Sequence, residues 1–404
     1  MDLFAGIDWA SDHHDVLVLN QDCIKEASFR AEHSFKGIET LCADLKKLAQ
    51  GDLNRIGIAI ETSHGLLIAA LLEAGFNVYP VNPREVENRR KISGAKTDPI
   101  DAKILAKMLR ADYQDLRKLV PDNGLIVELR QLTRDQNSLI VAHTAVMNQF
   151  RACLLDYYLV LVGLFTELDS PITIAFLREY PTPAEARAAS IGQLAEFLKA
   201  NRYPKPNENA RRIYSKLHEP QLEAKPAIVR AKSRLALALA EQLQVLAKQV
   251  KAYDKEIVRL FKTHSDNIIY SSLPGAGERL APRMLAEWGD NRDKFNLVRE
   301  PQALAGTSPT PYQSGKLSRP HFRWSCVKNF RYAMHTFAWQ STLNEPWARE
   351  YYDAQRRRGK AHHQAIRALA NVWIRIIFAM WKRNEPYNRK VFLDAQSAHR
   401  RLIA

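Results

Sequence analysis

The stretch RIGIAIE, residues 55–61, decides the fold of the first part of the chain. An apolar run without polar alternation is typical of a strand that is buried on both faces, as in a parallel sheet. The run GLLIAALLEAG at 65–75 predicts a helix closed by a glycine, and NVYPVN at 77–82 predicts another short strand. This alternation of strand and helix predicts an α/β domain.

The flanking residues extend the same pattern. Three short β-type runs come before the buried strand, at 3–8, 15–20 and 26–35. Helices are predicted at 37–49, 83–91 and 98–112. We therefore expect one α/β domain over residues 1–120, a usual size for a single domain.

The remainder of the chain is predicted to be mainly helical, in two parts. Residues 121–263 hold two long helical stretches, at about 124–166 and 228–263, with apolar residues every three or four positions, as in a coiled coil or a two-helix arm. A proline-rich insertion at 170–226, irregular or built of small helices, separates them. Residues 264–404 predict a helical, basic C-terminal domain rich in aromatic residues.

The charge of the chain is unevenly distributed. The net charge is +15, but residues 1–120 carry −2 and residues 121–404 carry +17. A basic region of this size favours a polyanion as partner, with a merely basic soluble protein as the alternative.

The four cysteines lie far apart without zinc-site spacing, and no run has the length of a membrane span or the features of a leader peptide. These features predict a cytoplasmic protein.

Four carboxylates of the first domain stand out. Asp8 and Glu61 each end a predicted strand, and strand ends can converge at one edge of a sheet. Asp98 and Asp101 lie three residues apart at a helix start, which places them on one face. Each has a structural alternative, since Asp8 could start a turn, Asp98 could cap the helix and Asp101 could complement its dipole. Together the four predict a site for two Mg²⁺ ions.

The order GID, IE and KTDPIDA resembles the RuvC-like DEDD domain of the IS-one-ten family of insertion-sequence transposases and of the related Piv-type DNA invertases. The resemblance implies an RNase H-like fold for the N-terminal domain. It also implies catalytic metal ligands at Asp8, Glu61, Asp98 and Asp101.

Two motifs of the C-terminal domain resemble parts of the same family. LPGAGERLAPRMLAEWGD, 273–290, resembles a helix–hairpin–helix element in which Gly275 and Gly277 let backbone N–H groups approach a phosphate, although an ordinary turn would also suit them. AGTSPTPYQSG, 305–315, resembles the block that precedes a basic helix, with Thr307 and Ser308 replacing the usual pair. Prolines bracket the stretch TPYQSGKLSRP, which is predicted to be a loop over 310–320. The resemblance implies that Ser314 is the nucleophile and forms a phosphoserine link to DNA.

A serine needs a base or a metal to remove its proton. The nearest downstream histidine is His321, seven residues away, so the metal site of the first domain could instead activate Ser314 if the two domains meet. Gly315 would allow close approach of a phosphate. Five basic residues could neutralise phosphate charge or could form a solvated face: Lys316, Arg319, Arg323, Lys328 and Arg331. Three tryptophans are predicted to lie in the core, not to stack on bases: Trp324, Trp339 and Trp373.

The resemblance further implies DNA as the substrate, Mg²⁺ as the cofactor and a noncoding bridge RNA that pairs with donor and target DNA. It implies a homodimer that assembles into a tetramer, with sites that combine acids and serine from different protomers, and association with the bacterial nucleoid. The favoured interpretation is an RNA-guided DNA transposase or site-specific recombinase. The alternatives are a metal-dependent junction-resolving nuclease that uses water, and a noncatalytic nucleic-acid-binding protein.

Overall fold

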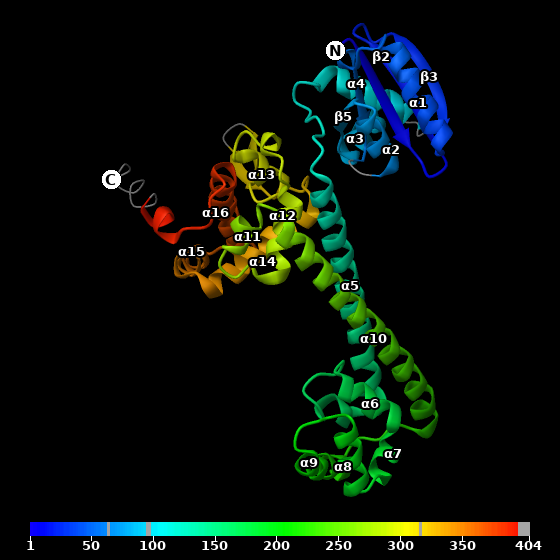
Figure 1. Cartoon of the computed structure of the whole chain (residues 1–404), viewed down its shortest axis with the longest axis vertical. Coiled ribbons are helices and arrows are strands. Elements are labelled where there is room, and N and C mark those ends of the chain that lie inside the picture. Colours follow the sequence, from blue (N-terminus) through cyan, green and yellow to red (C-terminus); the bar gives the residue numbers. More distant parts are fainter. Residues whose placement is uncertain (63–64, 94–97, 315–316, 395–404) are drawn as a thin grey trace. The chain divides into compact units, whose positions relative to one another are not determined.

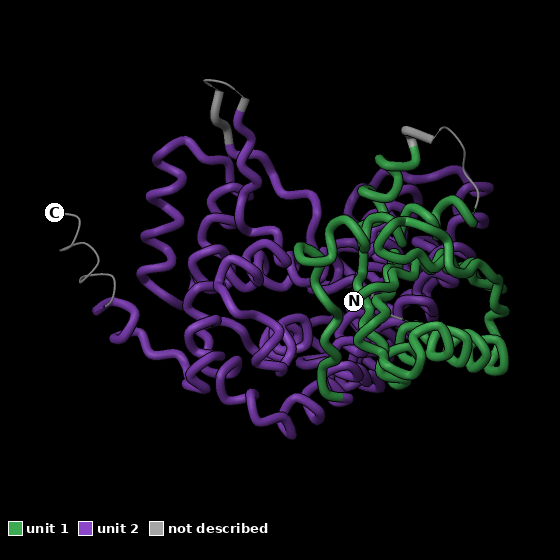
Figure 2. The backbone as a smooth tube through the Cα atoms, turned by 90° about the horizontal axis from the view of Figure 1, so that it is seen from above, with its two compact units in different colours: residues 1–123 green, residues 124–404 purple. Residues whose placement is uncertain are grey.

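The computed structural model describes residues 1–62, 65–93, 98–314 and 317–394. The chain divides into two compact units, Met1–Asn123 and Gly124–Ala404 (Figure 2). The first unit is mixed α/β and the second is mostly helical, as the sequence predicts.

The first unit is built on a five-stranded sheet with the order β3-β2-β1-β4-β5. β1 runs antiparallel to β2 and parallel to β4, and β5 runs parallel to β4. All five residues of β4 are buried, as expected of the apolar run that predicted this strand. The strand bounds are Leu3–Trp9 (β1), His13–Asn20 (β2), Lys25–Glu32 (β3), Ile56–Ile60 (β4) and Asn77–Pro80 (β5).

Helices pack on both faces of this sheet (Figure 1). Leu3, Ala5 and Ile7 of β1 share a core with α1 and α2, whereas the intervening Phe4 packs with α4. This alternation follows from the two-residue period of a strand. The helix bounds are Phe35–Leu48 (α1), Leu66–Glu73 (α2), Pro83–Ser93 (α3) and Asp98–Asp112 (α4), with a short 3-10 helix, η1, at Leu53–Arg55.

Two long helices, α5 (Gly124–Tyr157) and α10 (Pro226–Thr263), run antiparallel side by side in the second unit (Figure 1). Gln136 donates a hydrogen bond to Asp254 at 2.7 Å near one end, and Lys232 pairs with Asp156 at 2.5 Å near the other. This pairing within one chain fits the predicted two-helix arm. The first helix ends earlier than the predicted residue 166, and a 3-10 helix, η2 (Leu159–Gly163), follows it.

The segment predicted as an insertion consists of four short helices that share a separate core with the adjoining ends of α5 and α10. Proline occupies the first turn of three of them, where its missing N–H costs no hydrogen bond. The bounds are Pro171–Glu179 (α6), Pro183–Ala188 (α7), Ile191–Ala200 (α8) and Pro206–His218 (α9).

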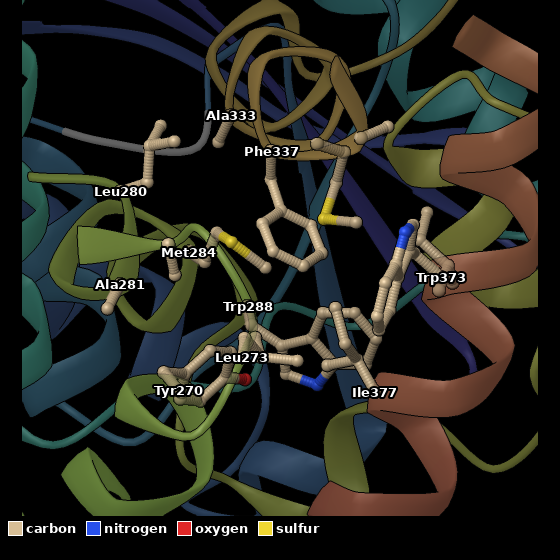
Figure 3. Packing of buried hydrophobic residues seen from close by; sticks show 14 of the residues in the cluster. Tyr270, Leu273, Leu280, Ala281, Met284, Trp288, Ala333, Phe337, Trp373 and Ile377 are labelled. Carbon is tan, nitrogen blue, oxygen red and sulfur yellow. The ribbon is translucent and has the colours of Figure 1, made fainter. Parts of the chain in front are cut away.

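A second core of this unit joins the opposite ends of α5 and α10 to the C-terminal helices (Figure 3). Trp288, Phe337 and Trp373 are fully buried in it, and the indole N–H of Trp373 donates to the Ser341 hydroxyl at 2.8 Å. The bounds are Asn267–Ser271 (α11), Gly277–Trp288 (α12), Arg292–Lys294 (η3), Arg299–Leu304 (α13), Thr310–Ser314 (β6), Leu317–His321 (β7), Lys328–Asn344 (α14), Pro346–Arg357 (α15) and His362–Arg383 (α16).

The predicted burial of the three tryptophans is confirmed only for Trp373. Trp324 is 68% exposed, so its assignment to the core was wrong. It precedes the first residue of α14 and therefore has no helix face to bury. Trp339 lies on α14 but remains 36% exposed, with its ring edge-on to Tyr352.

Candidate active site

The parallel pairing of β1 and β4 positions the first two predicted acids. Ile7 lies opposite Ile60 in this ladder, so Asp8 and Glu61 are the next residues along neighbouring parallel strands. The carboxyl ends of both strands meet at the same edge of the sheet. The structure thus brings together two residues that are 53 positions apart in sequence.

The other two acids lie on α4, which packs against β1. Gly6 makes this close packing possible, because a Cβ there would lie only 2.0 Å from the Ala102 carbonyl oxygen. α4 begins at Asp98, so Asp98 and Asp101 both lie in its first turn. The residue before Asp98 lies outside the described part of the chain, so the predicted capping role of Asp98 cannot be compared with the structure.

The electrostatics of Asp8 reflect the convergence of all four acids. The pKa of Asp8 is raised to about 7, first by burial and then by the charges of four carboxylates: Asp101, Glu61, Asp98 and Asp15. Negative charge brought together in this way favours either a proton or a cation at the site. The carboxylates predicted from the sequence therefore form one cluster, and their role as metal ligands stays a prediction.

Asp101 is the most deeply placed of these acids, with 4% of its surface exposed. The guanidinium group of Arg90, on α3, binds it through two hydrogen bonds, of which Nε to Oδ1 measures 2.7 Å. A two-point arginine–carboxylate contact fixes the orientation of the carboxylate. Arg90 thus positions one acid of the cluster.

The predicted nucleophile lies at the tip of a β-hairpin in the second unit. Ser314 ends β6, and its Cα is paired with that of Leu317 in β7. The sequence predicted a loop over 310–320, and the structure replaces it with this two-stranded ribbon. His321 pairs with Thr310 at the other end of β6, four residues from Ser314. At about 3.3 Å per residue this is roughly 13 Å along the strand, so His321 is not within hydrogen-bond reach of Ser314.

The basic residues predicted to contact phosphate divide into two groups. Gly315 and Lys316 lie outside the described residues, and so does the side chain of Arg319. The other three are described: Arg323 donates through Nε to the Ser308 carbonyl at 3.3 Å, Arg331 donates to the Arg323 carbonyl, and Lys328 is exposed at the start of α14.

The two glycines of the turn before α12 differ in their surroundings. Gly275 has φ +82° and packs against the end of α14, because a Cβ there would lie 2.6 Å from Nδ2 of Asn344. Gly277 has φ +58° and nothing within 4 Å of its Cβ position. Packing within the chain is therefore sufficient to explain Gly275. A contact of either glycine with nucleic acid stays a prediction.

Comparison with known proteins identifies the family. One family model, described as a transposase, matches residues 5–159, and a second, described as transposase of the IS116/IS110/IS902 family, matches residues 269–353. The chain is 33% identical over 383 residues to a candidate transposase of the IS117 mini-circle of Streptomyces coelicolor, with 91% of each protein covered. It is 29% identical over 406 residues to a 42 kDa protein of insertion element IS900 of Mycobacterium paratuberculosis, with 96% of this chain and 97% of that protein covered.

The chain belongs to the IS116/IS110/IS902 family of transposases. The match to the first model includes all four carboxylates of the cluster, and the match to the second includes Gly275, Gly277 and Ser314. The transposase acts on DNA, as the basic charge of its larger part predicts. Among the residues that the structure describes, no helix has the length and apolar character needed to cross a membrane.

Two further residues of the transposase lie beside the acidic cluster and were not predicted from the sequence, His13 and Asp15. Nε2 of His13 lies 3.5 Å from Asp98 and 3.6 Å from Asp15, so the three side chains could share one cation. Asp15 pairs with Arg30 at 2.8 Å and lies opposite Asp8 in the β1–β2 ladder. The available signal was the pair of short β-type runs at 3–8 and 15–20, because an antiparallel return after Asp8 places β2 residues next to it.

Proposed function

We propose that this transposase cuts and rejoins DNA strands through a covalent phosphoserine link at Ser314, aided by Mg²⁺ at the acidic cluster. The single observation that carries the metal part is geometric: Asp8 and Glu61 end neighbouring parallel strands, and Asp98 and Asp101 lie in the first turn of α4, which packs against β1. An RNase H-like fold of the first unit is part of the proposal. Its support is a mixed sheet of order β3-β2-β1-β4-β5 in which β2 alone runs antiparallel to the rest.

The donor set fits a hard divalent cation. The four predicted ligands are Asp8, Glu61, Asp98 and Asp101, and all offer carboxylate oxygens, which Mg²⁺ prefers. Burial and then the neighbouring carboxylates raise the pKa of Asp8 to about 7, so a cation beside Asp8 would be favoured. Two bound Mg²⁺ ions would supply charge stabilisation at the phosphate and favour loss of the serine proton.

The residues of the chain have separate tasks in this proposal. Arg90 holds the carboxylate of Asp101 in one orientation, which keeps the ligand set in place before substrate binds. Nε2 of His13 lies 3.5 Å from the carboxylate of Asp98 and could add a nitrogen ligand to a cation held there. The hairpin β6–β7 carries Ser314 at its tip, and we assign to this serine the attack on DNA.

The serine reaction conserves the energy of the phosphodiester bond. The Ser314 hydroxyl oxygen forms a bond to phosphorus, and the bond from phosphorus to one bridging sugar oxygen breaks. The serine gives up its proton, and the leaving sugar oxygen gains one. In the second step a sugar hydroxyl of another strand attacks the phosphoserine and releases Ser314, so no water is consumed.

Guidance by a noncoding bridge RNA and assembly of dimers into a tetramer complete the proposal. The support for a second nucleic acid is the charge of the larger part of the chain, +17 over residues 121–404. That much basic charge suits the binding of more than one polyanion. Both features remain expectations from the family resemblance.

The test is recombination between a donor plasmid and a target plasmid, with and without RNA transcribed from the flanks of the element. Wild-type protein should recombine the plasmids only with RNA and Mg²⁺, and Ser314→Ala and Asp101→Ala should both abolish recombination. Recombination by all three proteins alike would overturn the proposal. Cleavage retained by Ser314→Ala would indicate the water-using nuclease instead.

A further inference from the structure

A cationic cluster lies beside the hairpin that carries Ser314. The guanidinium groups of Arg331 (α14) and Arg367 (α16) lie over the ring of Phe322, with their central carbons 4.4 and 4.7 Å from its centroid. Phe322 directly follows the last residue of β7. The two arginines are close enough for the charge of Arg331 to lower the pKa of Arg367, after burial, which lowers it most.

The charges that act on His335 and on Cys326, two residues beside this cluster, are positive. Burial and then the charges of Arg367, Arg331 and His363 lower the pKa of His335 to about 4. The charges acting on the Cys326 thiol come from Arg331, Lys328 and Arg323. No ion pair among the described residues involves Arg331 or Arg367, and two buried nitrogens, Nε of Arg331 and Nε2 of His335, have no hydrogen-bond partner there. Like charges held together without a counter-ion favour binding of an anion.

Arg331 is fixed in place before any ligand binds. It donates a hydrogen bond to the carbonyl oxygen of Arg323. The side chain of Arg323 donates through Nε to the Ser308 carbonyl oxygen at 3.3 Å. Gly306, with φ +62°, makes room for it, because a Cβ there would lie 2.4 Å from Nη2 of Arg331. A donor held in advance loses little entropy on binding a phosphate.

An exposed aromatic ring adjoins these cations. Trp324 is 68% exposed, and its ring stands edge-to-face against Phe322 with centroids 4.7 Å apart. An indole supported at one edge and open to solvent over most of its surface is suited to stack on a nucleic-acid base. A base inside a duplex is covered by its neighbours, so stacking of this kind requires an unpaired strand.

We propose that Trp324, Arg331 and Arg367 bind one nucleotide of single-stranded DNA, the base stacking on the indole and the phosphate contacting the two guanidinium groups. The strand would be the one that Ser314 cuts, because Phe322 follows the base of the same hairpin, roughly 13 Å along the strand from Ser314, a distance that a few unpaired nucleotides can span. In naming that strand the inference rests on the proposed function, whereas binding itself needs neither a metal nor the serine. Single-stranded RNA offers the same phosphate and base chemistry and is distinguished by the test.

The test is fluorescence anisotropy with the full-length protein, EDTA and a fluorescein-labelled 20-mer of deoxythymidine. Trp324→Ala should weaken binding about tenfold, the scale of one base–aromatic stack, and Trp324→Phe should restore most of the affinity. Arg367→Gln should lower the slope of log Kd against log salt concentration by about 0.7, the value for one phosphate contact on a single strand.

Matched controls come from the same helices. Trp339→Ala removes a partly exposed tryptophan of α14 whose ring contacts Tyr352 and His362, two helical turns beyond Arg331, and Arg375→Gln removes an exposed arginine of α16. Both should leave the affinity within about twofold of wild type and should change the salt slope by much less than the value of about 0.7 for one phosphate contact. Circular dichroism of each variant confirms that it is folded.

Unchanged affinity in folded Trp324→Ala would overturn the inference, as would an equal loss with a blunt duplex of the same length. Tighter binding of the matching RNA 20-mer, with the same dependence on Trp324, would overturn the assignment to DNA. The assay contains no divalent ion and measures binding alone, so its outcome does not depend on the proposed metal and serine chemistry. A failure of the proposed chemistry is therefore distinguishable from a failure of this site.

Discussion

Gly6 of β1 lies so close to α4 that its Cα nearly contacts the helix backbone: a Cβ on it would lie 2.0 Å from the carbonyl oxygen of Ala102 and 2.5 Å from the amide nitrogen of Ala106. Asp101 directly precedes Ala102, and Asp8 follows Gly6 by two positions. The absent side chain of Gly6 is therefore what allows acids from a strand and a helix to meet.

Gly6→Ala should separate α4 from the sheet. Because the new methyl group meets backbone atoms, which cannot rotate away, we expect a loss of about 2–3 kcal/mol in unfolding free energy. Weaker Mn²⁺ binding in calorimetry should accompany it. Gly192→Ala is the control, since its Cβ would meet nothing closer than 3.9 Å and alanine favours its helix. Equal stability of Gly6→Ala and wild type would contradict this view of the helix contact.

Asp8→Asn should change how stability depends on pH in the metal-free protein. The pKa of Asp8 is raised from 3.8 to about 7, so between these values the folded state holds a proton that the unfolded state has released. The contribution of Asp8 therefore favours folding at low pH and is lost as the pH rises through about 7.

In EDTA at pH 8 the Asn variant should melt at a higher temperature than wild type, and the difference should shrink toward pH 4. Mg²⁺ at pH 8 should stabilise wild type more than the variant. Glu39→Gln, an exposed residue of α1, is the charge-matched control and should follow wild type. The same pH dependence in Asp8→Asn and wild type would show that Asp8 does not carry this charge.

Arg90→Gln should destabilise the metal-free protein by about 3 kcal/mol, because it leaves the buried Asp101 carboxylate without its cation. Saturating Mg²⁺ should recover part of that loss if Asp101 is a ligand. Arg89→Gln breaks an exposed pair with Asp112 and should cost less than about 1 kcal/mol. Urea unfolding with and without Mg²⁺ measures both, and an equal loss in the two conditions would argue against metal at Asp101.

Gly275→Ala should cost roughly 1–3 kcal/mol, because alanine is strained at φ +82° and its Cβ would press on Asn344. Gly124→Ala, at the open start of α5, should be neutral or slightly stabilising. Thermal unfolding compares the two. A Gly275→Ala protein as stable as wild type, with weakened DNA binding, would instead favour contact with nucleic acid.

The positions of Asp8 and Glu61 at strand ends could be predicted from the sequence. The packing of α4, which brings Asp98 and Asp101 to them, could not. Asp8 and Glu61 follow apolar runs, and strand ends converge in any parallel sheet, so local pattern was enough. The role of Gly6 depends on which helix packs against it. The residues next to Gly6 in the sequence do not indicate that contact. Asp15 required the register of the β1–β2 pairing, which sequence spacing alone does not fix.

The structure of residues 310–320 and the burial of Trp324 were also predicted wrongly from local sequence pattern. Pro311 and Pro320 predicted a loop, yet they pair with each other in a two-stranded ribbon, where each strand has only one neighbour. Proline is tolerated at such an edge, because its missing N–H need not be part of a ladder. Trp324 was assigned to a helix that begins four residues later, at Lys328, so its exposure could not follow from periodicity.

The central claim is that Ser314 forms a covalent bond to DNA with help from the acidic cluster. The most direct measurement is mass spectrometry of peptides from protein denatured during reaction with donor DNA, RNA and Mg²⁺. The account predicts a nucleotide-linked peptide containing Ser314 in wild type and none in Ser314→Ala or Asp101→Ala. Cleaved DNA without that adduct, or strand transfer by Ser314→Ala, would contradict it.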